Sequence, residues 1–337
     1  MKFKKLLILI IVVSLLLVLA LIKNSAQKKQ LIQEEITAVQ PCVLTRDLAT
    51  GFIQKVTIYK GDAEKDKVVL LKNSDNNWKM ENKFGVKAKK ENVENLLQDL
   101  SGLKGELRAE SKSVFGDFSL EDAQGIHIIL EAEGAKPLAH IIASLHRPNW
   151  NSSFLRLKDS EKIILVQKDI LGRLNIYGPE TKLESNSFAD FKLLSLDTKK
   201  IEKIETSRKG KNVFTLVKKK ESDNKYNWDF EPAAKRTEID PAKIDDFLRN
   251  ISNIFAQDVL DPSLSDYGFG QDNFSLLLDT DEKKTIALEV GNYLEKEKSY
   301  YVKIVPENQV FKVPEYAIQK IKKDKNYFLK EKIPKTK

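Results

Sequence analysis

The sequence predicts an α+β fold: a tandem repeat of two mainly antiparallel β units, each with one substantial helix, preceded by a single N-terminal transmembrane helix. The repeat is visible in the residue pattern of positions 53–174, which returns about 150 positions later in positions 201–321. In each copy, short runs of alternating apolar residues are joined by brief turns, which is typical of antiparallel hairpins. One run in each copy has helical spacing instead.

The transmembrane prediction rests on the apolar run of residues 6–22, in which Ser14 alone is polar and lysines stand on both sides. This length reaches the minimum for a membrane-spanning helix. Residues 1–27 are therefore predicted to be a retained signal anchor, with a linker over 28–46. The competing interpretation is a cleaved signal peptide, but its only candidate site, Asn24-Ser25-Ala26, has a large polar residue where a small one is expected. The short N-terminal flank places the body outside the cytoplasmic membrane, in the periplasm.

The net charge of +8 comes from the two ends of the chain. The first 35 residues hold six lysines and the last 18 hold eight, whereas positions 36–319 carry 43 basic and 45 acidic residues. Nucleic-acid-binding domains carry their basic excess on a folded face, so nucleic acid is not expected as a partner. The basic tail, residues 331–337, is interpreted as solvated, with contact to anionic lipid as the alternative. Cys42, the only cysteine, is placed in the linker.

The first strands are predicted from alternating apolar residues. The first repeat, residues 47–194, opens with a strand over 53–58, turns at Gly61 and returns over 68–71. The second repeat, residues 195–330, opens with strands around 201–204 and 213–217 on either side of Gly210. A third strand begins at Trp78 in one copy and Trp228 in the other. Because a large aromatic residue occupies the same place twice, both tryptophans are predicted to be core residues.

The clearest single element is a helix in the second repeat. Asp240 can cap its N-terminus, and Pro241 suits the first helical position because its missing donor would be unpaired there. The apolar residues that follow keep helical spacing and predict one buried stripe: Ile244, Phe247, Leu248, Ile251, Ile254 and Phe255. The first repeat lacks the cap but keeps the stripe, with Val93, Leu96, Leu97, Leu100 and Leu103.

An aromatic-glycine corner follows each helix, at Phe115-Gly116 and Tyr267-Gly268, and each glycine is predicted to have a positive φ angle. Two hairpins come next in each copy. They comprise residues 125–131 with 138–143 and 154–157 with 163–166, then 274–278 with 285–290 and 300–305 with 310–313. Short amphipathic segments, 169–174 and 315–321, end the copies. Each unit is therefore expected to have about seven strands.

The order of these features resembles a known bacterial family. The features are the apolar N-terminus, an Ile-x-Lys-Ile strand, a polar turn into a tryptophan, a capped helix, a Tyr-Gly-Phe corner and a hairpin followed by Tyr-x-x-Lys. They are similar to the family called domain of unknown function 4340, in two copies over nearly all of positions 47–330. The resemblance implies a membrane-anchored envelope protein, and some members are encoded near ABC-type export permeases tied to gliding motility. No catalytic residues are assigned to the family.

No group of residues in the sequence predicts a catalytic, cofactor-binding or metal site. His127 lies among isoleucines in a predicted strand, which favours a structural role. His140 and His146 lack the cysteines or the helical histidine pair of a zinc site. An alternative is an envelope hydrolase with a site around His140, His146 and Arg147, where the copies diverge. Substitution of both histidines by alanine tests that alternative.

The sequence thus predicts a non-catalytic binding or scaffold module of the cell envelope, with a membrane anchor and a protein partner, accessory to an ABC-type transport complex. The alternatives are the hydrolase and a lipid- or glycan-binding protein with a site in the first repeat. The two copies agree at apolar, turn and capping positions, which specify folding. Four features occur only once: the anchor, residues 146–150, residues 175–187 and the lysine tail. Function is expected in these features.

Overall fold

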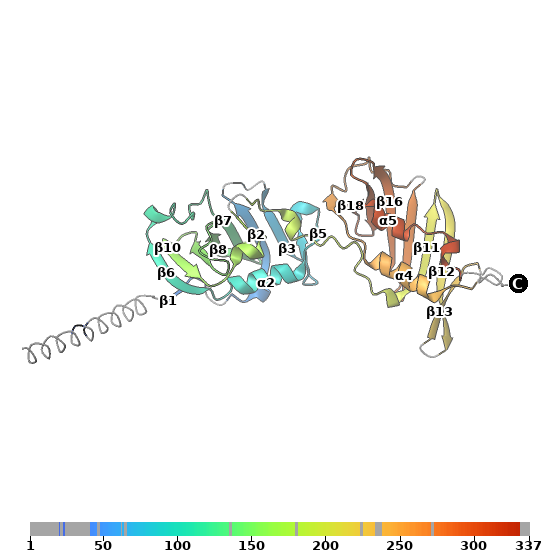
Figure 1. Cartoon of the computed structure of the whole chain (residues 1–337), viewed down its shortest axis with the longest axis horizontal. Helices are drawn as coiled ribbons and strands as arrows, with labels where there is room; N and C mark the ends of the chain where they lie inside the picture. The colour runs from blue at the N-terminus through green and yellow to red at the C-terminus, as the bar shows by residue number, and fades with distance from the viewer. Residues whose placement is uncertain are drawn as a thin grey trace, which may run out of the picture. The chain divides into compact units, whose positions relative to one another are not determined.

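The computed structural model describes residues 20, 23, 41–45, 48–61, 63, 66–134, 137–178, 181–222, 225–232, 238–270 and 273–330 (Figure 1). The predicted anchor lies almost wholly outside these ranges, and the basic tail lies entirely outside them. Within the described ranges, no helix combines the length and the apolar character needed to cross a membrane.

Two antiparallel sheets form most of the described chain, which confirms the α+β class. The chain divides into two compact units, residues 1–66 with 94–183 and residues 67–93 with 184–337. The strands of one sheet all precede residue 167, and the strands of the other all follow residue 200.

The first sheet has ten strands in the order β1-β6-β10-β9-β8-β7-β2-β3-β4-β5. The predicted strand pairs of the first repeat all occur in it, and β7 pairs with β8 over Ile126↔Ala143 to Glu131↔Pro137. The bounds are β1 Pro41–Val43, β2 Ile53–Lys60, β3 Val68–Lys72, β4 Trp78–Met80, β5 Val86–Lys87, β6 Lys104–Glu110, β7 Ile126–Ala132, β8 Pro137–Ala143, β9 Ser153–Leu157 and β10 Lys162–Val166.

The second sheet has eight strands in the order β13-β12-β11-β15-β16-β17-β18-β14. Its hairpins are those that the alternation of apolar residues predicts. The bounds are β11 Ile201–Arg208, β12 Lys211–Ser222, β13 Lys225–Phe230, β14 Asp258–Leu260, β15 Phe274–Thr280, β16 Thr285–Leu294, β17 Ser299–Val305 and β18 Gln309–Pro314.

The two sheets share one strand order. In the first sheet, β4-β3-β2-β7-β8-β9-β10-β6 is the counterpart, strand by strand along the chain, of the complete second sheet. β5 and β1 are added at the two edges of the first sheet. The order agrees with the predicted repeat, and it locates the additions of the first copy at the sheet edges.

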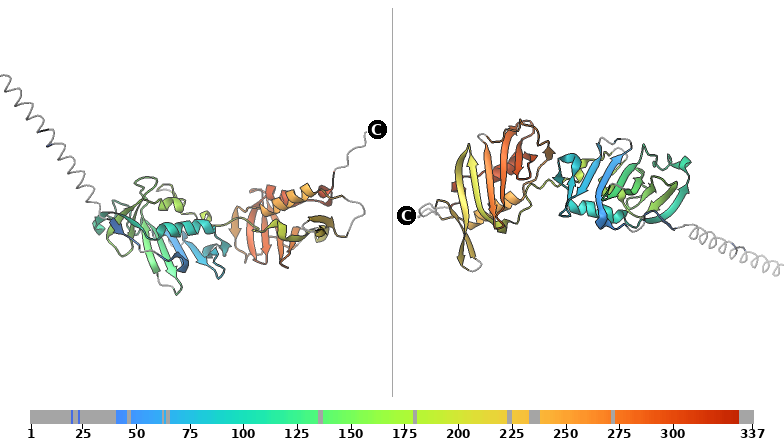
Figure 2. Two further views of the ribbon diagram at one scale, coloured as in Figure 1. Left: turned by 90° about the horizontal axis from the view of Figure 1, so that it is seen from below. Right: turned by 180° about the vertical axis from the view of Figure 1, so that it is seen from behind.

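Helices lie against one face of each sheet. α2 (Lys90–Leu100) crosses the first sheet, whereas α4 (Pro241–Ser252) and α5 (Glu315–Ile321) both lie on the same face of the second (Figure 2). The predicted cap of α4 is confirmed: Asp240 Oδ1 accepts a hydrogen bond from the backbone N–H of Ala242 at 3.0 Å. The buried residues of α4 are Ile244, Phe247, Leu248 and Ile251, and the stripe of α2 is buried in the same way.

Aromatic rings fill the core beneath α4. The ring of Phe328, on the short helix η7 (Lys325–Phe328), lies 4.9 Å from that of Phe214 and 5.1 Å from that of Phe247, in edge-to-face contacts. Phe230 on β13 makes further contacts of this kind with Phe214 and Phe328. Such pairs add about 0.5–1.5 kcal/mol each to the stabilisation from burial. The helix η7 therefore contributes Phe328 to the core of this unit.

Each sheet has more strands than the seven expected. β6 has a polar sequence with Leu107 as its one large apolar residue, and β14 has only three residues. β1 pairs with β6 and β14 pairs with β18, in each case across a long stretch of sequence, so a short window of alternation cannot reveal them. Cys42, which the sequence placed in a linker, lies in β1.

Two predicted core positions differ from expectation. Trp78 is 1% exposed, as predicted, but Trp228 is only partly buried because it lies on β13, the edge strand of the second sheet. Phe255 is 51% exposed. Because α4 ends at Ser252, helical spacing no longer directs Phe255 into the core.

Of the two glycine corners, one has the predicted positive φ angle and the other does not. Gly268 has a positive φ of 72°, as expected, whereas Gly116 does not have a positive φ. The chain leaves the short helix η4 (Lys112–Val114) through Phe115 with a φ of −57°, which continues a right-handed turn. The left-handed residue of this corner is Ser119, with a φ of 52°.

Candidate functional site

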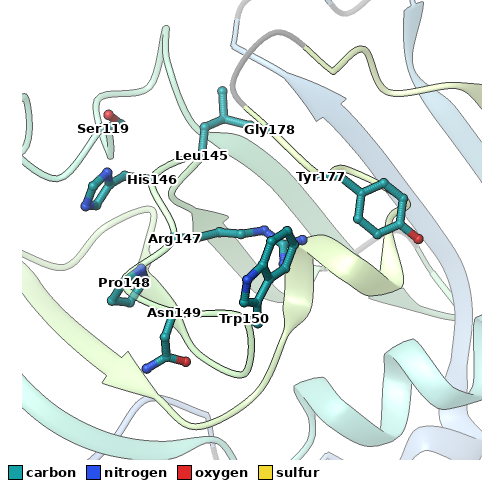
Figure 3. Close-up of a pocket in the computed structure, with 9 residues that line it drawn as sticks. All are labelled: Ser119, Leu145, His146, Arg147, Pro148, Asn149, Trp150, Tyr177 and Gly178. Carbon is teal, nitrogen blue, oxygen red and sulfur yellow. The ribbon is translucent and has the colours of Figure 1, made fainter.

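The two stretches that occur only in the first copy meet at one cavity. We call it the loop pocket; it has a volume of about 480 Å³. It lies beside the loop between β8 and β9 and the segment that follows α3 (Ile170–Arg173), as Figure 3 shows. The lining residues are Ser119, Leu145, His146, Arg147, Pro148, Asn149, Trp150, Tyr177 and Gly178.

Short polar side chains shape the β8–β9 loop. Ser144 is fully buried, and its hydroxyl donates to the carbonyl oxygen of Phe118 and accepts from the backbone N–H of His146 at 2.9 Å. Asn149 Oδ1 accepts from the backbone N–H of Asn151, also at 2.9 Å. These local bonds replace the strand pairing that ends at Ala143, and they leave the tip of the loop, Pro148 to Trp150, exposed.

Arg147 links this loop to the second stretch. Its side chain is only 11% exposed, and Nη2 donates to the carbonyl oxygen of Ile176 at 2.5 Å. Nη1 forms an ion pair with Asp169 Oδ1 at 3.0 Å, and the same Oδ1 caps α3 by accepting from Gly172 N at 2.9 Å. The guanidinium therefore fixes the position of the segment after α3 against the loop.

Two exposed aromatic rings lie near the Arg147 guanidinium. Its central carbon lies 5.3 Å from the ring centroid of Trp150 and 5.9 Å from that of Tyr177. Trp150 is 68% exposed and Tyr177 is 60% exposed. Single exposed aromatics are normal on a protein surface, but two that share one buried cation in a cavity are typical of a contact surface.

A second cavity, of about 740 Å³, shares Tyr177 with the loop pocket. Its wall contains Asp99 of α2, which forms ion pairs with Lys168 Nζ at 3.1 Å and with Arg173 Nε at 2.6 Å. These pairs hold α3 to the end of α2. Asn151 and Gln167 add uncharged polar groups to the same wall.

The histidines of the hydrolase alternative line different cavities. His146 lines the loop pocket and stacks on Phe154, with ring centroids 6.2 Å apart. His140 lines a separate cavity with Leu138 and Lys158, and its Nε2 lies 2.9 Å from Nδ1 of His127. His127 is 2% exposed and hydrogen-bonded, as its predicted structural role requires. Among the described residues, no group of three or more His, Cys, Asp or Glu could hold a metal ion.

The comparison with protein-family models shows the family to which the chain belongs. A family model described as domain of unknown function (DUF4340) matches residues 78–269, more than half of the chain. The chain belongs to the DUF4340 family. The DUF4340 match is a single span that includes the loop pocket, so the presence of two DUF4340 copies stays a prediction. No curated protein and no solved structure gives a significant match.

Both stretches that form the loop pocket could be identified from the sequence, but the contact between them could not. Nothing in the spacing of residues 146–150 and 175–187 indicates that they meet, because the contact depends on the turn that α3 makes after β10. The linking role of Arg147 was also missed. The one signal in the sequence for this linking role is that Arg147 lies in the same insertion as Trp150.

Proposed function

We propose that this protein is a membrane-anchored envelope protein that acts as a non-catalytic binding module, with the loop pocket as its contact surface. The apolar run of residues 6–22 supports the anchor, and the short N-terminal flank before it supports a body outside the cytoplasmic membrane. One observation carries the binding role. The stretches that the second half of the chain lacks converge on a cavity with two exposed aromatic rings.

The chemistry of the loop pocket favours binding. Nη2 of Arg147 donates to Ile176, Nη1 forms an ion pair with Asp169, and Asp169 in turn caps α3, so these charged groups stabilise the walls. The rings of Trp150 and Tyr177 are exposed at this pocket, as are the polar side chains of His146 and Asn149. Exposed aromatic rings held by a rigid frame supply contact energy at a low entropic cost.

We further propose that the anchored body is accessory to an ABC-type transport complex. This accessory role is supported by the resemblance to the DUF4340 family, because that resemblance implies a protein of the kind encoded near ABC-type export permeases. In this arrangement the anchor keeps the protein beside the permease, and the loop pocket contacts a partner or ligand outside the membrane.

Photo-crosslinking in cells tests the binding role. A photoreactive amino acid in place of Asn149, which is exposed at the loop pocket, is expected to form a discrete adduct on illumination of the full-length protein. The matched control carries the same amino acid in place of Lys296, an exposed turn residue of the second sheet. Mass spectrometry then identifies the adduct as polypeptide, lipid or glycan.

The binding role predicts an adduct at position 149 and none at 296. An adduct that contains an ABC-type permease or its partner subunit would support the accessory role as well. Absence of an adduct at 149, together with no stoichiometric partner on affinity capture from detergent, would refute the binding role.

A further inference from the structure

We propose that the loop pocket binds an uncharged pyranose ring of an envelope glycan, stacked on the faces of Trp150 and Tyr177. This inference rests on the proposed function, in which the loop pocket is the contact surface, and adds the chemical class of its ligand. A pyranose ring has an apolar face of C–H groups and an edge of hydroxyl groups. A matching site therefore needs exposed aromatic faces beside uncharged hydrogen-bonding groups.

The charge balance of the pocket points to an uncharged ligand. The guanidinium of Arg147 is neutralised by Asp169 at 3.0 Å, and one of its nitrogens already donates to the carbonyl of Ile176. An anionic ligand would have to compete with Asp169 for this cation. Arg147 is therefore a positioning residue that holds the two aromatic rings.

The remaining groups of the pocket fit the hydroxyl edge of a sugar. Ser119 supplies a hydroxyl, Asn149 a carboxamide and His146 an imidazole, and these three side chains lie on the other side of Arg147 from Tyr177 (Figure 3). Each can donate or accept a hydrogen bond without carrying a charge. A pocket for a purely apolar ligand would not be lined by three such groups.

The neighbouring cavity has room for a ligand longer than one ring. It shares Tyr177 with the loop pocket and offers the carboxamides of Asn151 and Gln167. A second sugar unit beyond Tyr177 would meet these groups. We therefore expect an oligosaccharide to bind more tightly than a monosaccharide, as each added contact lowers the dissociation constant.

The experiment titrates the full-length protein with soluble tetrasaccharides of glucose and of N-acetylglucosamine, each with β-1,4 linkages, by isothermal calorimetry and ligand-observed NMR. The protein is kept in a detergent with a polyoxyethylene head group, because a glycoside detergent would occupy the site. Saturable binding of one tetrasaccharide is expected, with a dissociation constant of about 0.1–10 mM. We expect W150A to weaken it at least about tenfold and W150F to retain it within about threefold.

The control variant is Y226A, because Tyr226 is 50% exposed and lies under a lysine, Lys218, at 4.8 Å, but it belongs to the second sheet. It should bind as the wild type does. No saturable binding of either tetrasaccharide would overturn the sugar assignment, as would competition by sulfate or equal binding by W150A. If position 149 forms a polypeptide adduct in cells while both sugars fail, the ligand class is wrong and the binding role stands.

Discussion

At the scale of single residues, the hydrogen bonds of His127 and His140 fix their protonation. The carbonyl oxygen of Asp122 can only accept, so Nε2 of His127, 2.7 Å away, carries the proton. Nδ1 of a neutral His127 then accepts, and Nε2 of His140 must be its donor at 2.9 Å. Burial lowers the pKa of His127, and burial followed by the neighbouring His127 lowers the pKa of His140 to about 4. Both rings are therefore neutral at pH 7.

This pair makes the first sheet sensitive to acid. In the unfolded chain both histidines take up protons near pH 6.5, whereas the folded protein resists protonation to lower pH. Below pH 6.5 the unfolded chain therefore binds more protons than the folded protein does. The contribution of the two histidines to the free energy of unfolding is lost as the pH falls toward 4. We expect the wild type to lose more free energy of unfolding between pH 7.5 and 5 than H127Q/H140Q does, measured by urea denaturation. Equal losses in the two proteins would contradict this account.

The loop pocket shows which part of a site a sequence reveals at residue scale. Trp150 and Tyr177 lie in stretches without a counterpart in the second half, and that difference can be read directly from the printed chain. The ion pair between Arg147 and Asp169 joins residues on different sides of a hairpin. It depends on where α3 begins after β10, so only the folded chain shows it.

At the scale of elements, the aromatic residue Phe247 joins α4 to its sheet. Phe247 is fully buried and meets Phe214 and Phe328 edge to face, so it joins α4 to β12 and η7. The helix begins where Asp240 and Pro241 predict, because capping and proline geometry are local effects. Its position on the sheet depends on these non-local ring contacts.

F247A should therefore destabilise the second unit strongly. Removal of a buried phenylalanine side chain costs about 3–5 kcal/mol, since the surrounding rings cannot close the cavity. The matched control is F255A, because Phe255 follows the same helix but is 51% exposed. We expect its cost to be below about 1 kcal/mol. Denaturant unfolding followed by circular dichroism measures both, and similar losses for the two variants would contradict the described core.

The hairpins could be predicted from the sequence, whereas the strands β1, β5, β6 and β14 could not. Strands such as β15, with its alternating buried residues, carry a strict period of two that a short window detects. β6 lacks this signal, with only Leu107 as a large apolar residue in a mostly polar run. Its partners β1 and β10 lie far away in the sequence, so its pairing becomes visible only when the sheet has formed.

At the scale of the whole molecule, one strand order serves two sheets. The first sheet differs by its edge strands β1 and β5, and the loop pocket lies beside this sheet. Additions at sheet edges and loops leave the core of a unit unchanged. The shared strand order thus supplies a frame, and the differences between the two halves supply the surface that we propose for binding.

The lone cysteine allows the proposed orientation to be tested. Cys42 lies in β1, just after the predicted anchor and linker. We expect a membrane-impermeant maleimide to label it in intact spheroplasts, with no labelling of C42S. Because Cys42 is half-buried, K296C in the C42S background provides an exposed second reporter. Labelling of either site only after lysis would show that the body lies in the cytoplasm, and release of the protein by carbonate would show that the anchor is cleaved.

The edge position of β1 has a mechanical consequence. If the chain is tethered as proposed, any tension between membrane and body enters through Pro41 and reaches the β1–β6 pairing first, which comprises three residue pairs. β1 can detach without exposing much core, since Val43 is already 56% exposed. Beyond it, the Thr45 hydroxyl donates to the Leu100 carbonyl and accepts from the Leu103 backbone N–H, each at 2.9 Å. A pulled molecule would therefore lengthen by one short strand before force reached its core.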